Sequence, residues 1–370
     1  MFVFEDYISP ISESEFVGID PRSDVSPTST YYALKDLRNQ LRAAERNALV
    51  DEEGISSLSR DWLPLLEQCS SALKTQSKDI EYLAWFIESL CRIHGFKGLA
   101  FGFRVAKSLI ESHFDNLYPV LDDDDEISDK VSALVGLNGT VAEGTLIIPI
   151  KSIYLTDSNS LEPFTFWEYQ QSYDISKMGE EKREKKIKAG ATEYSEVEKS
   201  ASETSTDFFV SLKQDINDAR EQFSLLSDVM DEVTGLPQPT SNIKKALESC
   251  LAAVEHVAAE KFAVLQADLD ELDSNQDTDI DDEGNIAVTT VKKTKSLDVD
   301  SRENAIEKLK EIALFFRKTE PHSPMSYTIE QVIRWSELSL PELLNELITD
   351  SDARSGYFKL SGIKIGETET

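Results

Sequence analysis

The residues best suited to chemistry are spread along the chain without the spacing that a catalytic or metal site needs. The four histidines show no ligand pattern, either beside a cysteine at zinc-finger distance or in an H-E-x-x-H motif: His94, His113, His256 and His322. His322 precedes Ser323, but adjacency does not make a nucleophile–base pair, because the hydroxyl must meet an imidazole that a third group holds. We interpret His322 as a polar cap between helices.

The other ligand-like patterns lack essential positions. Residues 95–102 read GFKGLAFG without the Gly-Lys-Ser/Thr of a phosphate-binding loop, so a tight turn between helices is favoured. A second stretch alternates oxygen side chains like an EF-hand loop, yet Thr278 replaces its glycine and Gly284 its bidentate glutamate: Asp273, Asn275, Asp277, Asp279 and Asp281. We therefore expect no metal site, no cofactor and no catalytic residue, and the chain is predicted not to be an enzyme.

The charge and composition of the chain indicate which kinds of partner and which cellular compartment to expect. The 370 residues include 38 basic and 69 acidic ones, a net charge of −31, whereas nucleic-acid binding needs a basic face. The start MFVFEDYISP does not resemble a signal peptide, and the apolar run Leu146–Ile150 is too short to span a bilayer. Three widely separated cysteines favour a reducing compartment: Cys69, Cys91 and Cys250. We expect a cytoplasmic protein with no nucleic-acid partner and no membrane insertion.

The elements that would position any site are predicted to be helices. Apolar residues recur at three- and four-residue spacing over 31–48 and again over 62–73. Ser77 is expected to cap a third helix, which is apolar on most sides and therefore central. Gly95 and Gly98 are expected to separate that helix from a fourth.

The segment that follows is less clearly helical. Residues 145–155 read TLIIPIKSIYL, and their β-branched residues and proline suggest a short strand or an extended packing segment. Residues 176–204 lose apolar periodicity, which is typical of a charged linker or a solvated helix. The four tryptophans are expected in cores, because they lie among periodic apolar residues: Trp62, Trp85, Trp167 and Trp335.

The rest of the sequence predicts two further helical parts. Periodicity over 208–233 and 241–269 indicates a helical hairpin. Residues 268–283 hold nine acidic and no basic residues, which is typical of a linker, and the last block predicts three short helices and a tail. The expected fold is all-α, with helical bundles joined by charged and acidic linkers: an N-terminal domain at 1–175, a charged linker at 176–204, a hairpin at 205–267, an acidic linker at 268–299 and a C-terminal domain at 300–370.

Six short segments occur in order between about residues 16 and 170: GIDPRSD (18–24), YYALKDLRNQLRAAER (31–46), DW (61–62), SKDIEYLAWF (77–86), HGFKGLAFG (94–102) and FDNLYP (114–119). Their order and spacing resemble the ImpA N-terminal domain, which defines the TssA proteins of bacterial type VI secretion systems. The resemblance implies structural or docking roles for the motif residues: Asp20, Pro21, Arg22, Arg38, Arg42, Glu45, Arg46, Trp62, Lys78, Asp79, Gly95, Gly98, Tyr118 and Pro119.

The C-terminal block adds to this resemblance. FFRKTEPHSPMSYTIEQVIRW (315–335) is similar to a C-terminal segment of one group of these proteins. The resemblance implies a non-catalytic assembly factor that helps to organise the baseplate, the contractile sheath and its inner tube, with a C-terminal domain that forms a ring. The residues expected to carry this homo-oligomer are Phe316, Glu320, Pro321, His322, Ser323, Pro324, Ile329, Ile333, Trp335, Leu343 and Leu344.

Alternatives remain open at this stage. Six charged motif residues are expected to form ion pairs between helices, which favours fold maintenance over partner contact: Arg38, Arg42, Glu45, Arg46, Lys78 and Asp79. A helical adaptor or chaperone outside secretion, acting as a monomer or dimer, is the first rival. A hydrolase is the second, and a cleft with a strongly perturbed carboxylate or histidine would favour it.

Overall fold

The helix α4 (Ile80–His113) runs through the centre of the bundle, because its sequence is apolar on most sides. Asp79 begins it, and its carboxylate accepts a hydrogen bond from the backbone N–H of Tyr82 at 3.0 Å. The cap that the sequence analysis assigned to Ser77 is thus formed two residues later. Gly95, at φ +56°, kinks α4 into two helical halves.

This computed structural model describes residues 2–51, 54–122, 124–158 and 160–274, and in the C-terminal part residues 306, 309–310, 312–313, 317, 325–337 and 343. The chain divides into two units, Met1–Ile280 and Asp281–Thr370. The described residues form helices, turns and isolated bridges without a strand, so the expected all-α class is confirmed. The acidic linker predicted at 268–299 lies outside the described residues beyond Ser274, where α12 (Ala259–Ser274) ends, and so does most of the calcium-like loop.

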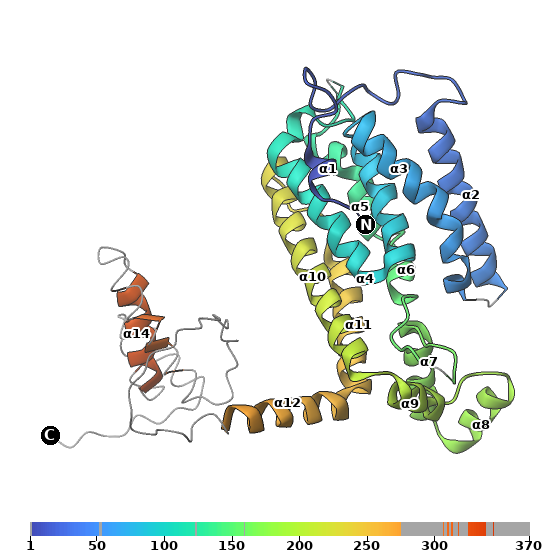
Figure 1. The fold of residues 1–370 in the computed structure, drawn as a ribbon, viewed down its shortest axis with the longest axis vertical. Coiled ribbons are helices and arrows are strands. Elements are labelled where there is room, and N and C mark those ends of the chain that lie inside the picture. Colours follow the sequence, from blue (N-terminus) through green and yellow to red (C-terminus); the bar gives the residue numbers. More distant parts are fainter. Residues whose placement is uncertain are drawn as a thin grey trace, which may run out of the picture. The chain divides into compact units, whose positions relative to one another are not determined.

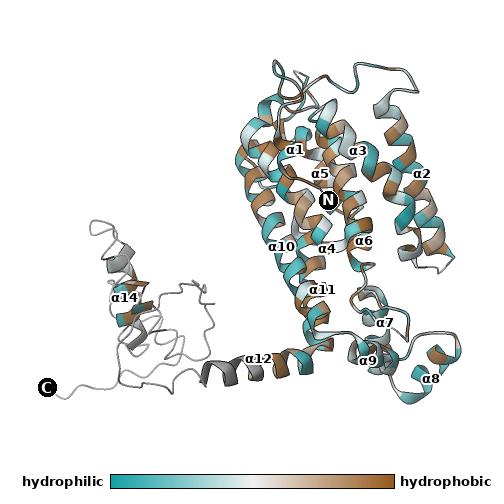
Figure 2. Cartoon of the chain, viewed as in Figure 1, coloured by the Kyte–Doolittle hydropathy of each residue, from teal (hydrophilic) through white to brown (hydrophobic). Residues whose placement is uncertain are grey.

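The elements before and around α4 are helical. They are α1 (Glu5–Ile8), α2 (Thr30–Val50), the 3-10 helix η1 (Ile55–Trp62) and α3 (Leu63–Thr75). Figure 1 shows α2 at the edge of the bundle, where it packs on α3 and η1. Figure 2 shows that the hydrophobic residues of these helices gather on their inward faces, as amphipathic packing requires.

After α4 the chain forms short helices: η2 (Phe114–Asn116), η3 (Ile127–Val131), α5 (Ser132–Asn138), α6 (Ile147–Lys151) and α7 (Phe166–Ser176). The short strand or extended segment expected over 145–155 is therefore wrong, because its centre is helical. Pro149 lies in the first turn of α6, where a missing N–H costs no intrahelical hydrogen bond. The strand-like composition instead reflects burial, since Ile147 and Ile150 are both in the core.

The next helices are α8 (Glu180–Lys188), α9 (Tyr194–Glu203), α10 (Thr206–Thr234), α11 (Ser241–Val257) and α12 (Ala259–Ser274). Residues 176–204, expected as a charged linker or a solvated helix, thus form two helices, of which α9 buries Val197. The hairpin of α10 and α11 packs on α4, and the ring centroids of Phe103 and Phe223 lie 4.9 Å apart. The structure therefore joins in one core segments that the sequence analysis divided.

The second unit contains the helix α14 (Met325–Glu337). Ile333 is buried, Trp335 and Ile329 are half-buried, and Arg317 forms an ion pair with Glu330 at 3.1 Å. Leu343 is also half-buried. The other residues assigned to oligomerisation lie outside the described residues: Phe316, Glu320, Pro321, His322, Ser323, Pro324 and Leu344.

Candidate functional site

The motif residues of α2 meet α4 through a ladder of polar contacts. Tyr31, Arg38 and Glu45 are seven residues apart, so two helical turns separate each from the next and they share one face. The Tyr31 hydroxyl donates to Glu81 at 2.7 Å. Two ion pairs follow along α4, from Arg38 to Glu88 and from Arg92 to Glu45.

The central ion pair, between Arg38 and Glu88, is closed to solvent on the Glu88 side, because Glu88 is fully buried. Two N–H groups of Arg38 donate hydrogen bonds to the Glu88 carboxylate, and the Thr145 hydroxyl donates to Glu88 Oε1 at 2.5 Å. Burial acts to raise the pKa of Glu88, but Arg38, Arg92 and Thr145 outweigh it and hold that pKa below its usual value. Glu88 is thus a fixed anion that joins α2, α4 and the loop before α6.

The third rung is also closed to solvent. Arg92 donates to both carboxylate oxygens of Glu45, at 2.6 and 2.8 Å, and its side chain is only 3% exposed. Its guanidinium carbon lies 3.6 Å from the ring centroid of Trp62, which is fully buried. A stacked and bidentate arginine is held in one geometry. This rung therefore acts as a structural clamp.

Arg22 joins the N-terminal segment to the start of α4. It bonds Asp79 at 2.7 Å and also pairs with Glu81, while its backbone N–H donates to Asp20 at 2.9 Å. Pro21 sets the turn between these two residues. Burial raises the pKa of Asp79 to about 6 although Arg22 opposes that rise, so Arg22 is the cation that favours its ionised form.

Lys78 differs from the expectation, because it forms no ion pair in the described part of the chain. The side chain is fully buried, and its Nζ donates to the carbonyls of Tyr7 at 2.6 Å and of Leu73 at 2.8 Å. Burial without a carboxylate lowers its pKa to about 8. Lys78 therefore fastens α1 to the end of α3.

Two motif arginines stay outside the ladder. Arg42 is half-buried and Arg46 is exposed, and neither has a carboxylate within 4 Å among the described residues. Burial lowers the pKa of Arg42; the nearby Glu88 opposes this, while the charges of Arg38, Arg46 and Arg92 add to it. The expected ion pairs thus form at Arg38, Glu45 and Asp79, but not at Arg42, Arg46 or Lys78.

The glycines and the last motif shape the backbone. A Cβ atom on Gly98 would lie 2.4 Å from the carbonyl oxygen of Leu90, so the two halves of α4 approach closely where they meet. The Tyr118 hydroxyl donates to the carbonyl of Gly18 at 3.1 Å, and the Tyr118–Pro119 peptide is cis. The motif residues are therefore brought into one framework around the ends and the kink of α4.

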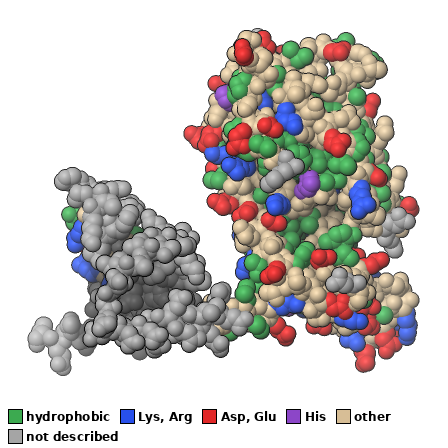
Figure 3. Space-filling model, in the orientation of Figure 1, with side chains coloured by type: hydrophobic (Ala, Val, Ile, Leu, Met, Phe, Trp, Pro, Cys, Tyr) green, Lys and Arg blue, Asp and Glu red, His purple; other side chains and the backbone are tan. Residues whose placement is uncertain are grey.

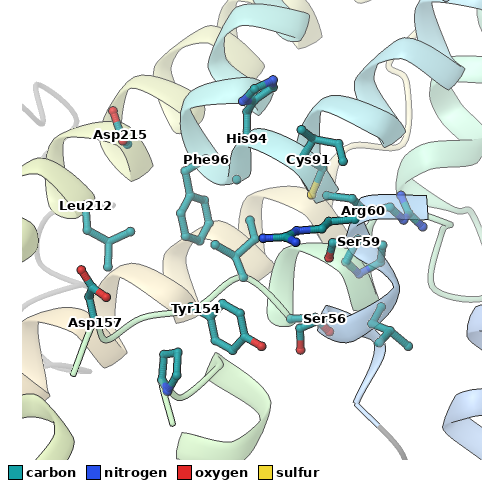
Figure 4. A pocket seen from close by; sticks show the side chains of 18 of the residues that line it. Ser56, Ser59, Arg60, Cys91, His94, Phe96, Tyr154, Asp157, Leu212 and Asp215 are labelled. Atoms are coloured by element: carbon teal, nitrogen blue, oxygen red, sulfur yellow. The ribbon is translucent and has the colours of Figure 1, made fainter. Parts of the chain in front are cut away.

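A hollow of about 690 Å³ lies beside the Gly95 kink. Figure 4 shows Phe96, Tyr154 and Leu212 around it, with Asp157 toward one side. Sequence reasoning did not predict this hollow, because its walls come from segments far apart in the chain. No group of three or more potential metal ligands occurs among the residues that the structure describes.

The histidines near these elements serve packing. His94 meets the ring of Phe2 edge-on at 5.5 Å, and His113 stacks on Phe16 at 3.5 Å. His256 Nδ1 lies 2.9 Å from the Tyr169 hydroxyl. His322 lies outside the described residues. None of these three contacts pairs an imidazole with an activated serine or cysteine, so they offer no nucleophile.

The prediction that all four tryptophans lie in cores is wrong for Trp167. Its side chain is 62% exposed, whereas Trp62 and Trp85 are buried and Trp335 is half-buried. The neighbours of Trp167 on α7, Phe166 and Tyr169, occupy the buried face instead. In the described part of the chain, no helix is long and apolar enough to cross a membrane.

The N-terminal part of the chain is similar to known proteins. Residues 8–139 match the family described as ImpA, N-terminal, type VI secretion system. The type VI secretion system component TssA1 of Pseudomonas aeruginosa is 31% identical over 103 residues. That alignment covers 28% of this chain and 29% of the relative, so it spans less than a third of either protein.

A solved structure shows the same fold. It is the N-terminal domain, including the conserved ImpA_N region, of the TssA component of the type VI secretion system from Burkholderia cenocepacia. The likeness has a TM-score of 0.56 at 20% identity and covers 70% of this chain and 94% of that one. The shared fold thus extends beyond residues 8–139. Through residues 8–139, the chain is thus similar to the ImpA N-terminal region of TssA components of the type VI secretion system.

Proposed function

We propose that this chain is a non-catalytic assembly component of the type VI secretion system. It organises the baseplate, the contractile sheath and the inner tube from the cytoplasm, as a ring-forming homo-oligomer. The observation that carries the proposal is the match of residues 8–139 to the ImpA N-terminal region. The ion pairs Arg38–Glu88 and Arg92–Glu45 support it, since these charged side chains hold the fold and pair with each other rather than with a substrate.

The proposed division of labour follows from the two units. The first unit offers a rigid helical module, and the second carries the contacts between copies. Display of many modules on one ring raises avidity for a repetitive partner such as a sheath, without a tight single contact. No substrate, cofactor or nucleic acid enters this role.

Light scattering on the full chain and on a version that ends at Val299 tests the proposal. The full chain should be a high oligomer, and the shortened chain should fall to a monomer or dimer. A full chain that is itself a monomer or dimer supports the rival helical adaptor. A shortened chain that keeps the full mass places the contacts between copies in the first unit.

Purified sheath, inner-tube and baseplate proteins give a second test. The full chain should cosediment with at least one of them, and the shortened chain should bind the same partner more weakly because avidity is lost. Equal binding by both forms would show that multivalent display does not contribute.

A further inference from the structure

The helix α8 is largely exposed. None of its nine residues is buried, Ile187 is half-buried, and the helix packs lightly against α7. Figure 2 shows it as one of the most hydrophilic helices of the first unit. A nine-residue helix without a buried face is marginal on its own, so its own charges must stabilise it.

Those charges fall into two sets. Glu180 and Glu181 lie in the first turn, which suits the helix dipole, and two ion pairs join residues four apart: Glu181 with Lys185 and Glu184 with Lys188. The second set is three neighbouring cations on the surface, Lys182, Arg183 and Lys186. None of them has a carboxylate within 4 Å among the described residues. Lys182 and Lys186 are four apart and repel each other.

This basic face lies in a chain of net charge −31. Residues 177–188 hold six basic and three acidic residues. Figure 3 shows Asp and Glu side chains scattered over the visible face of the first unit. Two copies of so acidic a chain repel each other, and cations of one that meet anions of the other at their contact reduce this repulsion. A second copy therefore offers an acidic partner for this face.

We propose that the basic face of α8, formed by Lys182, Arg183 and Lys186, docks on the acidic surface of the first unit of a second copy. The inference rests on the homo-oligomer proposed above and adds a second contact to it. Because the three cations are exposed, each ion pair is weak singly and effective only when several form together. The contact is electrostatic, so salt weakens it.

Sedimentation velocity of the full chain tests the proposal at 0.1 M and 1 M salt, where the Debye length is ~10 Å and ~3 Å. High salt should weaken association of the unmodified chain about tenfold, as three modest pairs acting together would. The variant Lys182→Glu, Arg183→Glu, Lys186→Glu should associate weakly at both salt concentrations. Circular dichroism should show a folded protein, because the three substituted side chains are exposed.

Two control variants separate this face from net charge. Exposed cations on α4, α9 and α11 give the same charge change elsewhere and should leave association intact: Lys97→Glu, Lys199→Glu and Lys245→Glu. The variant Lys182→Arg, Lys186→Arg keeps the charge of α8 and should behave like the unmodified chain.

The outcomes are distinct. If the chain is an oligomer and the α8 charge reversal leaves its mass and salt dependence unchanged, the docking proposal fails while the proposed function stands. If the unmodified chain is a monomer at both salt concentrations, the proposed ring fails as well. Cosedimentation with duplex DNA or anionic vesicles that the α8 reversal abolishes, with association unchanged, would assign the face to a phosphate surface and overturn the proposal.

Discussion

Arg38 on α2 donates to the fully buried Glu88 on α4, with Nη2 3.1 Å from Oε1, across fifty residues of sequence. This pair fixes an edge helix that otherwise packs on α3 and η1. A buried carboxylate is tolerated only when paired and hydrogen-bonded, which here requires Arg38 and Thr145 together. The pair thus sets the position of α2 more than it adds net stability.

Arg38→Met should destabilise the first unit by about 3–5 kcal/mol, because it leaves Glu88 buried without its partner. In the unmodified chain the pKa of Glu88 is lowered, so its stabilising contribution is present near neutral pH and is lost as pH falls through that pKa. In Arg38→Met burial should raise that pKa above the unfolded value, and the variant should gain stability on acidification from pH 8 to 5. Urea unfolding of the variant and of the unmodified chain between pH 5 and 8 measures the destabilisation and its dependence on pH.

The double variant Arg38→Met, Glu88→Leu is the matched control. It removes the buried charge along with its partner, so it should recover most of the lost stability and lose the altered pH dependence. A single Arg38→Met variant as stable as the unmodified chain would show that the pair is not needed to hold α2.

Arg22→Gln should raise the pKa of Asp79 further above its present value of about 6, because Arg22 is the cation that opposes the effect of burial. A carboxylate with a raised folded pKa binds more protons in the folded state, so stability falls as pH rises through the window. The deficit of the variant relative to the unmodified chain should therefore grow between pH 6 and 8. Thermal unfolding at several pH values measures it.

Adding Asp79→Asn to Arg22→Gln tests the cause. Asparagine can still cap α4, but it cannot ionise. The double variant should show a deficit that does not change between pH 6 and 8, whereas a persistent slope would mean that another group titrates there.

Sequence patterns could predict the helices but not their pairing. Periodicity indicated α2, α3, α10 and α11, and the apolar run before Gly95 indicated a central helix. Glu88 lies inside that run, and a lone carboxylate there could have signalled a buried ion pair. Its partner could not be read from sequence, since the choice among Arg38, Arg42 and Arg46 depends on how α2 lies against α4.

The other differences between the sequence-based predictions and the structure arise where two neighbouring residues, or two kinds of element, suit the same position. Ser77 and Asp79 are both good caps, and Asp79 forms the cap because it also meets Arg22. The strand-like composition over 145–155 reflects burial, which β-branched residues serve in a helix as well. Trp167 lies one residue from Phe166, and only packing decides which of the two faces the core.

Lys78 should make stability depend on pH above neutrality. Its pKa is lowered to about 8 in the folded chain, so the contribution of Lys78 to stability rises with pH between pH 8 and 10. The buried thiols of Cys69, Cys91 and Cys250 act in the opposite direction, because burial raises their pKa values in the folded chain. Lys78→Met should remove the Lys78 contribution, so the stability of the variant should fall more steeply with pH than that of the unmodified chain. Urea unfolding of both proteins between pH 7.5 and 9.5 measures this difference, and equal slopes would contradict the assignment.

Gly98→Ala should destabilise the first unit by about 1–3 kcal/mol, because the new Cβ would lie 2.4 Å from the backbone oxygen of Leu90 and force the halves of α4 apart. Gly136→Ala is the matched control, since Gly136 lies in α5 with no atom within 4 Å of an added Cβ. That change should be neutral or stabilise by up to about 1 kcal/mol, because alanine favours the helix. Urea unfolding of both variants measures these changes. Equal stability of Gly98→Ala and the unmodified chain would show that α4 does not need glycine where its two halves meet.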